Sequence, residues 1–210
     1  MKATTENLDL IDRYLEQRKL DFLDYKLEIK DHIASQAEDL CEKQNINFED
    51  ALPKVLKEWE PSLILKSSIW ISNKNSFPAI VISGIKKRYL IYNSIILPVM
   101  IVFFVLQFIF KNEIENENTG KLLFIVSTSL SLLLSVLRYF TFRSNYQTSY
   151  SYEFIRIYKM AIMFWCFDMM FYYNSGITTI LFKAMVVTYF PIAIYSFFKH
   201  KQFQNRVINL

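Results

Sequence analysis

An apolar segment of 21 residues, Leu90–Phe110, constrains this sequence more than any other feature. It follows Lys86-Lys87-Arg88 directly, and no charged side chain occurs between Arg88 and Lys111. An α-helix rises 1.5 Å per residue, so about 20 residues cross the roughly 30 Å hydrocarbon layer of a bilayer. Clustered Lys and Arg favour the cytoplasmic end of a span. The segment therefore predicts a transmembrane helix that begins in the cytoplasm, which places the upstream residues there too.

Three more apolar segments follow, and with the first they predict spans at about 90–110, 121–139, 155–173 and 177–198. The tight turn Asn174-Ser175-Gly176 joins the last two, a polar loop over 111–120 joins the first two, and a polar loop over 141–153 joins the second to the third. Ten cations flank the predicted cytoplasmic side: Lys86, Lys87, Arg88, Arg138, Arg143, Arg156, Lys159, Lys199, Lys201 and Arg206. The outer side has only Lys111 and Lys121, offset by glutamates. The positive-inside rule therefore predicts a four-span membrane protein with both termini in the cytoplasm.

The charge of the chain is divided between its two ends. Residues 1–60 carry 9 Lys and Arg against 15 Asp and Glu, a net −6, while the remaining residues carry 15 against 5, a net +10. The basic excess stands beside apolar runs rather than on a polar face, which favours a lipid bilayer as partner and no direct binding of nucleic acid. The composition thus indicates an acidic soluble part joined to a basic membrane part.

Residues 1–60 show the apolar spacing of three short helices. The second helix is expected to be capped by Asp21 and to run to about Gln44, and the third to begin after Asn47 and to end at Pro61. One face of the second helix is apolar, and its members are Phe22, Tyr25, Ile29, Ile33, Ala37, Leu40 and Cys41. The predicted fold class is all-α, with a small cytoplasmic three-helix domain (1–60) followed by a four-helix transmembrane bundle (89–210).

The segment "EIKDHIASQAEDLCEKQNINFEDALPKVLKEW" resembles the three-helix HAAS domain, also known as the permease-prefix domain of some bacterial transporters. The residues that match its pattern, E-[IL]-x-D-H-[IL] followed by F-x-[ED]-A, are Glu28, Asp31, His32, Phe48, Glu49 and Ala51. The family usually has a Gly before the third helix, where this chain has Gln44-Asn45-Ile46. The resemblance implies a cytoplasmic interaction domain that works with a PadR-like transcription regulator or a transporter permease, with Glu28, Asp31 and His32 on its partner-binding surface.

Residues 61–88 join the two parts. Their apolar residues, with Lys66, Lys74 and Trp70, fit either a helix that lies in the membrane interface or a partly ordered linker. Pro78 and Gly84 are expected to interrupt any continuous helix.

Asp168 and Lys183 are charged residues within predicted spans, where an ionised side chain costs a few kcal/mol or more. Each lies about seven residues from the centre of the Ser175-Gly176 turn, so an antiparallel hairpin would place both at the same depth. They are expected to form an intramembrane charge pair. A purely structural pair and a ligand or proton pathway both fit this pattern.

Ser127, Ser131 and Ser135 recur every four residues and predict a helix-packing face on the second span. No catalytic motif or paired metal ligands stand out, so no enzymatic activity, cofactor or metal is expected. The sequence favours an integral membrane regulatory or interaction protein. The alternative is a small transport-associated or channel-like subunit that uses the Asp168/Lys183 region, and homo-oligomers fit either function.

Overall fold

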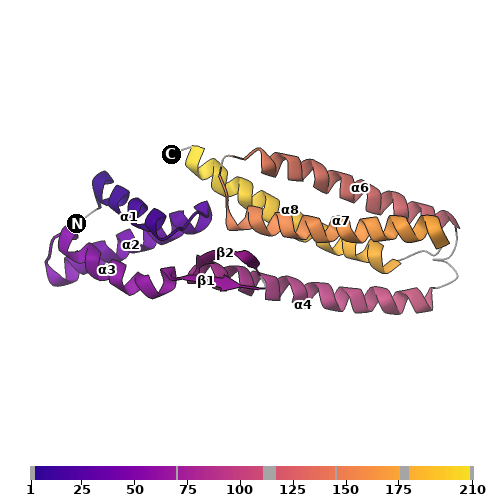
Figure 1. The fold of residues 1–210 in the computed structure, drawn as a ribbon, viewed down its shortest axis with the longest axis horizontal. Helices are drawn as coiled ribbons and strands as arrows, with labels where there is room; N and C mark the ends of the chain where they lie inside the picture. Colours follow the sequence, from indigo (N-terminus) through magenta and orange to yellow (C-terminus); the bar gives the residue numbers. More distant parts are fainter. Residues whose placement is uncertain (1–2, 70, 111–116, 145, 176–179, 209–210) are drawn as a thin grey trace. The chain divides into compact units, whose positions relative to one another are not determined.

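The computed structural model describes residues 3–69, 71–110, 117–144, 146–175 and 180–208. These residues are almost entirely α-helical, as the sequence predicts, with one two-stranded β-hairpin (Figure 1). The chain divides into two compact units. The N-terminal unit comprises Met1–Arg88 and Tyr146–Ser149, and the bundle unit comprises Tyr89–Asn145 and Tyr150–Leu210.

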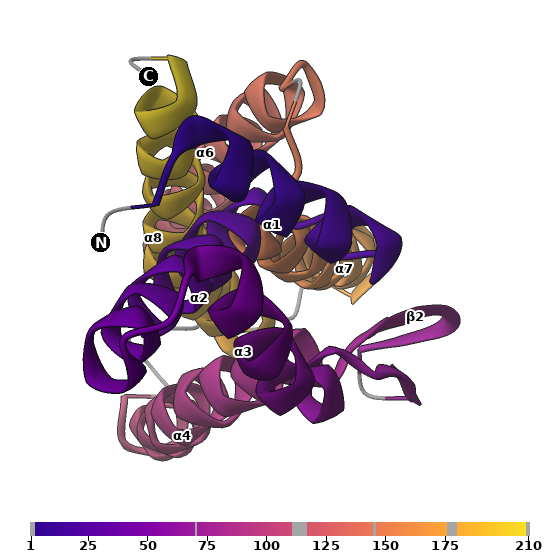
Figure 2. The same cartoon turned by 90° about the vertical axis from the view of Figure 1, so that its left-hand side faces the viewer.

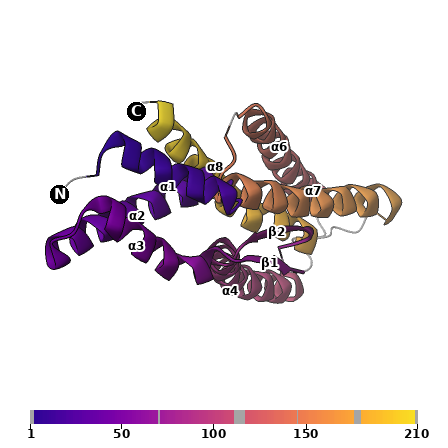
Figure 3. The same cartoon turned by 60° about the vertical axis from the view of Figure 1, so that its left-hand side comes forward.

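Three helices form most of the N-terminal unit: α1 (Thr5–Gln17), α2 (Leu23–Gln44) and α3 (Phe48–Leu63). Helix α2 packs against both α1 and α3 and lies between them (Figures 1 and 3). The apolar stripe predicted for α2 faces this core, since Ile29, Ile33 and Ala37 are at most 1% exposed. Burial of these aliphatic side chains holds the three short helices together.

The helix ends differ in detail from the sequence-based expectation. Phe22, not Asp21, precedes α2 as its N-cap residue and makes no side-chain cap bond. Asn45 ends α2 in the left-handed conformation (φ 52°), which Asn tolerates better than most residues. The turn before α3 therefore forms without the Gly that the HAAS family usually has there. Helix α3 passes through Pro61 and ends at Leu63, so the prediction that Pro61 stops it is wrong.

The described residues of 61–88 form the end of α3, a β-hairpin and the start of α4, in place of the expected interfacial helix or partly ordered linker. Strands β1 (Leu65–Ser68) and β2 (Ser72–Pro78) pair antiparallel, with Lys66 opposite Phe77 and Ser68 opposite Ser72. Helix α4 (Ala79–Ile109) begins directly after Pro78 and continues through Gly84. Pro78 therefore separates a strand from a helix, because proline is well accommodated at a helix N-terminus.

Four long helices, α4, α6 (Glu117–Phe142), α7 (Ser149–Ser175) and α8 (Ile180–Ile208), supply the bundle unit. Their shared core consists of Ile96, Leu134, Phe154, Ile157, Ala161, Met185, Ile192, Ala193 and Phe197. Helices α4 and α7 each begin in the N-terminal unit and continue into the bundle unit. The first five residues of α7 belong to a stretch for which the sequence predicts a polar loop.

Among the described residues, three helices are long and apolar enough to cross a membrane: Ala79–Ile109, Asn118–Phe142 and Ile180–Val207. They suit a membrane protein that crosses the bilayer more than once. Helix α7, predicted as the third of four spans, does not reach the same apolarity over the required length. Two predicted connections lie partly outside the described residues: residues 111–116 of the polar loop, and Gly176 of the tight turn.

Candidate functional site

Helix α2 presents a polar face to solvent on the side opposite its buried stripe. Glu28, Asp31 and His32, the residues predicted to form a partner-binding surface, are all exposed. The imidazole of His32 stacks on the indole ring of Trp59 from α3, with ring centroids 6.4 Å apart and planes at 24°. Trp59 Nε1 in turn donates to Gln36 Oε1 at 2.7 Å. His32 is thus held on the surface by α3, while its edge stays open to solvent.

Two of the three lysines of α2 form ion pairs with acidic residues of α1. Lys26 Nζ lies 2.7 Å from Glu16 Oε1, and Lys30 Nζ lies 2.5 Å from Asp12 Oδ2. The hydrogen bond from Lys26 lowers the pKa of Glu16. Among the described residues, Glu28 and Asp31 take part in no such ion pair, so their negative charges face outward. No three His, Cys, Asp or Glu side chains gather as metal ligands in the part of the chain that the structure describes.

A buried polar cluster of Asp24, Arg88 and Ser149 (the Asp24 cluster) lies in the N-terminal unit. Asp24 is 4% exposed and Ser149 is 0% exposed. Asp24 Oδ1 accepts the backbone N–H of Ser149 at 2.8 Å, and its Oδ2 accepts the hydroxyl of Ser149. Arg88 Nη2 donates to Ser149 Oγ at 2.7 Å, and Leu23 N donates to Gln147 O at 2.9 Å. These bonds therefore join the start of α2 and Arg88 of α4 to the segment that leads into α7.

The Asp24 carboxylate acts as a cap for α7, because Ser149 is the first residue of that helix. A negative charge at a helix N-terminus satisfies an otherwise unbonded N–H and complements the helix dipole. Burial raises the pKa of Asp24, while the hydrogen bonds from Ser149 oppose that shift. Sequence reasoning missed this cluster, since no local pattern connects residues 125 positions apart.

Helix α4 approaches α2 closely next to this cluster. A Cβ atom placed on Gly84 would lie 1.7 Å from the hydroxyl oxygen of Tyr25, and the Arg88 guanidinium lies 5.9 Å from the centroid of the same ring. Gly84, expected to interrupt the helix, instead allows the Tyr25 ring to pack against it. The first turns of α4 are thereby fixed to the three-helix core of their own unit.

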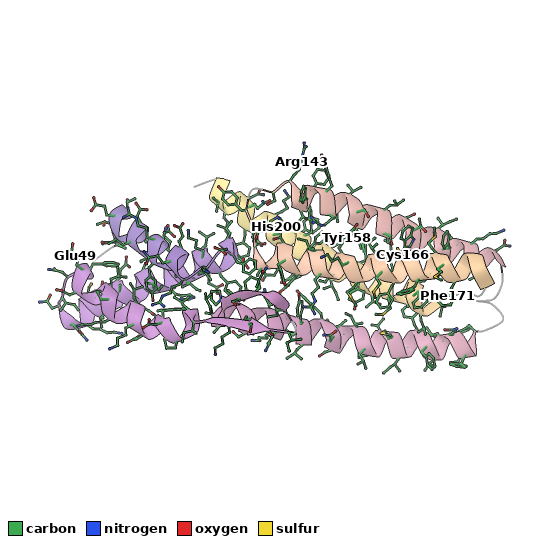
Figure 4. All side chains as sticks on the ribbon, in the orientation of Figure 1. Glu49, Arg143, Tyr158, Cys166, Phe171 and His200 are labelled. Carbon is green, nitrogen blue, oxygen red and sulfur yellow. The ribbon has the colours of Figure 1, made fainter. Side chains whose placement is uncertain are left out.

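Asp168 and Lys183 form an ion pair in the bundle unit. Lys183 Nζ of α8 lies 2.5 Å from Asp168 Oδ1 of α7, and the two side chains are 3% and 0% exposed. The rings of neighbouring residues also meet across these helices: Phe182 is stacked on Phe167 at 5.8 Å and tilted against Phe171 at 5.7 Å, and Figure 4 labels Phe171. The ion pair itself is buried, where each charge offsets the desolvation of the other.

The predicted serine face of α6 is mostly buried, with Ser127 and Ser131 at 1% and 2% exposure. Ser135 Oγ lies 3.4 Å from the hydroxyl of Tyr158 on α7, labelled in Figure 4. One position along α6 from Ser127, Thr128 Oγ1 accepts Trp165 Nε1 at 3.2 Å. Small side chains let two helices approach closely, so this face serves helix packing.

A second acidic side chain is buried near the start of α7. Glu153 is 0% exposed, and its Oε2 accepts the Tyr92 hydroxyl of α4 at 3.2 Å. One turn further along α7, the Arg156 guanidinium lies 4.5 Å from the centroid of the Tyr89 ring. Polar residues of α7 thus bond to tyrosines of α4, a pairing that the alternation of apolar and polar residues does not reveal.

The chain matches no protein-family model, no curated protein and no solved structure. The described residues offer an exposed charged face on α2 and buried polar groups that join helices.

Proposed function

We propose that this chain is an integral membrane regulatory or interaction protein, without catalytic activity of its own, whose N-terminal unit binds a protein partner in the cytoplasm. The observation that carries the proposal is the exposed face of α2, where Glu28 and Asp31 face solvent beside His32. Lys26 and Lys30 on the same helix are bonded to α1, whereas these two acids are not paired among the described residues. An acidic face of this kind complements a basic surface on a partner protein.

The proposal includes four spans, with α7 as the third and both termini in the cytoplasm of a bacterial inner membrane. Three charged residues lie within the third span as predicted (155–173): Arg156, Lys159 and Asp168. Asp168 is 0% exposed and accepts a hydrogen bond from Lys183 of α8, as is typical of a charged residue that faces the inside of a bundle. Arg156 and Lys159 stand near the predicted cytoplasmic end of the span, where cations are favoured. These three charges are therefore compatible with insertion of α7.

The same proposal treats the N-terminal unit as a relative of the HAAS or permease-prefix domain. Helices α1 to α3 are compatible with that domain, and the motif residues Glu28, Asp31 and His32 are exposed while Phe48 and Ala51 are buried. Buried motif residues would serve the three-helix core, and exposed ones would serve recognition. The expected partner is then a PadR-like transcription regulator or a transporter permease.

Charge reversal on α2 tests this function in the full-length protein. The variant Glu28→Lys/Asp31→Lys should lose its partner in affinity capture from native membranes. The matched control, Asp9→Lys/Glu58→Lys, makes the same change in net charge at exposed sites on α1 and α3 and should keep the partner. Equal recovery with both variants would contradict the proposal. Point variants are preferable to removal of residues 1–60, because that removal would leave Ser149 and Arg88 without Asp24.

A second candidate function rests on the buried ion pair of Asp168 and Lys183. Paired charges inside a bundle can mark an ion or proton pathway, so a small transport-associated or channel-like subunit, assembled as a homo-oligomer, is the alternative. Flux through vesicles that contain the purified protein, abolished by Asp168→Asn, would favour this alternative. Equal flux in vesicles with and without the protein would exclude it.

A further inference from the structure

The β1–β2 hairpin is a feature of the N-terminal unit that the proposed function leaves unused. Figure 2 shows it as an arm that projects from the helices of its unit. Ile69 at the end of β1 is 86% exposed, and Ile64 and Leu65 at the base are 50% and 39% exposed. Ile71, in contrast, is 6% exposed. The far end of the hairpin therefore presents an almost fully exposed isoleucine, and two more apolar side chains are exposed at its base. Such side chains on a projecting element suit a contact with a membrane or another protein.

The charge of the hairpin favours a membrane over a protein as the contact. Its two strands contain Lys66 and Lys74 and no acidic residue, although residues 1–60 of the same unit carry a net charge of −6. Lysines close to a bilayer are attracted by anionic headgroups. Apolar side chains flanked by lysines fit the boundary between headgroups and acyl chains.

The length of the hairpin suits the same contact. Its base is closed by a hydrogen bond from Ala79 N to Ile64 O at 2.9 Å, where β2 ends and α4 begins. From Ala79, the ten residues to Arg88 rise about 15 Å as a helix. The seven residues of β2 extend about 23 Å. Figure 1 shows the hairpin and the first turns of α4 extending in the same direction from the end of α3. By these two lengths the hairpin is long enough to reach the level of Arg88.

We propose that the tip of this hairpin inserts into the surface of the bilayer that α4 enters. Ile69 then lies at the acyl boundary, and Lys66 lies among the phosphates of anionic lipids. The hairpin gives the N-terminal unit a membrane attachment besides its helices, which limits its rotation and keeps the exposed face of α2 directed to the cytoplasm. The inference depends on the membrane insertion of α4 and not on the identity of the partner.

Depth measurements by spin labelling test the inference in the full-length protein. A nitroxide is attached at Ile69→Cys in a Cys166→Ser background, where the remaining Cys41 is buried. Two reference sites calibrate the measurement: Ser35→Cys on the exposed face of α2 and Leu97→Cys on the lipid-accessible part of α4. In vesicles of phosphatidylglycerol and phosphatidylcholine, we expect the label at 69 to be less accessible to a water-soluble nickel chelate than at 35, and more accessible to oxygen.

The role of the lysines is tested with the same label. Phosphatidylcholine vesicles, or the variant Lys66→Glu/Lys74→Glu, should shift the accessibility at 69 toward that at 35. A label at 69 as accessible to nickel as at 35 in both kinds of vesicle would overturn the inference. A label shielded from both reagents would overturn it too, since that result shows a protein contact. Neither result bears on partner capture through Glu28 and Asp31, so the two proposals fail separately.

Discussion

Replacing Asp168 by Leu removes one charge of a buried ion pair and leaves the other in place. Lys183 is 2% exposed, and the two charged atoms are 2.5 Å apart. Breaking such a pair costs about 3–5 kcal/mol, because the remaining charge is buried without compensation. For a chain of this size, 1 kcal/mol moves the unfolding midpoint by roughly 2–4 °C. We therefore expect Asp168→Leu to lower the midpoint by roughly 6–20 °C, and Lys183→Met to lower it as well.

The double variant Asp168→Leu/Lys183→Met is expected to unfold within a few degrees of the native protein. Replacing both members of a buried pair by apolar side chains of similar volume is often neutral, since no charge is left to desolvate. The assay is thermal unfolding of the full-length protein in detergent, followed by the near-ultraviolet circular dichroism of its aromatic residues. The charge-swapped variant Asp168→Lys/Lys183→Asp serves as a second test and should also recover relative to either single reversal. Double variants no more stable than the worse single one would refute the pairing.

Four other predictions concern the contacts that join helices. Asp24→Ala removes a charged acceptor of two hydrogen bonds and should lower the free energy of unfolding by about 3 kcal/mol. Ser149→Ala should lower it less, because the backbone N–H of residue 149 still bonds Asp24; equal unfolding midpoints for the two variants would contradict this. Burial raises the pKa of Asp24, so the folded protein holds this proton where the unfolded chain releases it. As pH rises from the ordinary pKa of 3.8 through the raised pKa of the folded protein, the native protein should therefore lose stability relative to the variant Asp24→Asn. Unfolding midpoints that run parallel for the two proteins across that range would refute the raised pKa of Asp24. Ser131→Leu should lower the free energy of unfolding by about 1–3 kcal/mol, because the larger side chain overpacks the buried face of α6. An unchanged unfolding midpoint would show that this face is not tightly packed. Gly84→Ala should lower the unfolding midpoint, because the new methyl group clashes with the Tyr25 hydroxyl. Gly84→Ala/Tyr25→Leu should recover part of the loss; no recovery would show that this clash is not the cause.

The sequence predicts well what depends on local periodicity. The helices of residues 5–63 follow from the spacing of apolar residues, and the long helices of the bundle unit follow from their length and apolarity. The contact between Asp168 and Lys183 also follows from the sequence, because two charges equally distant from a turn between antiparallel helices must lie at one depth.

The hairpin at 65–78 is less predictable, and the physical reason lies in its composition. Most of its residues are Ser, Asn and Lys, which favour strands weakly, and its Ile residues suit an interfacial helix as well as a strand. Pairing between two strands decides the outcome, and that pairing is not visible in either strand alone. The same reasoning applies to Gly84, since its tolerance within α4 depends on the packing of Tyr25.

The Asp24 cluster marks the limit of sequence reasoning on the candidate sites. Asp24 resembles any acidic residue in the first turn of a helix, and the residues around Ser149 read as a polar loop. Only the folded chain brings the carboxylate to the N-terminus of α7, which then begins at Ser149. Contacts between distant segments, rather than local preference, determine where that helix begins.

Site-specific photocrosslinking on α2 tests the central claim most directly. A photoreactive amino acid placed at Asp31 of the full-length protein, in cells of its natural host, should capture one discrete protein from the cytoplasmic side. The same group at the exposed Asp9 on α1 serves as the control and should capture none of it. Capture of a transcription regulator or a transporter permease at position 31 alone is the result that the proposed function predicts. The same products from both positions, or none from either, would contradict it and would direct attention to Asp168 and Lys183.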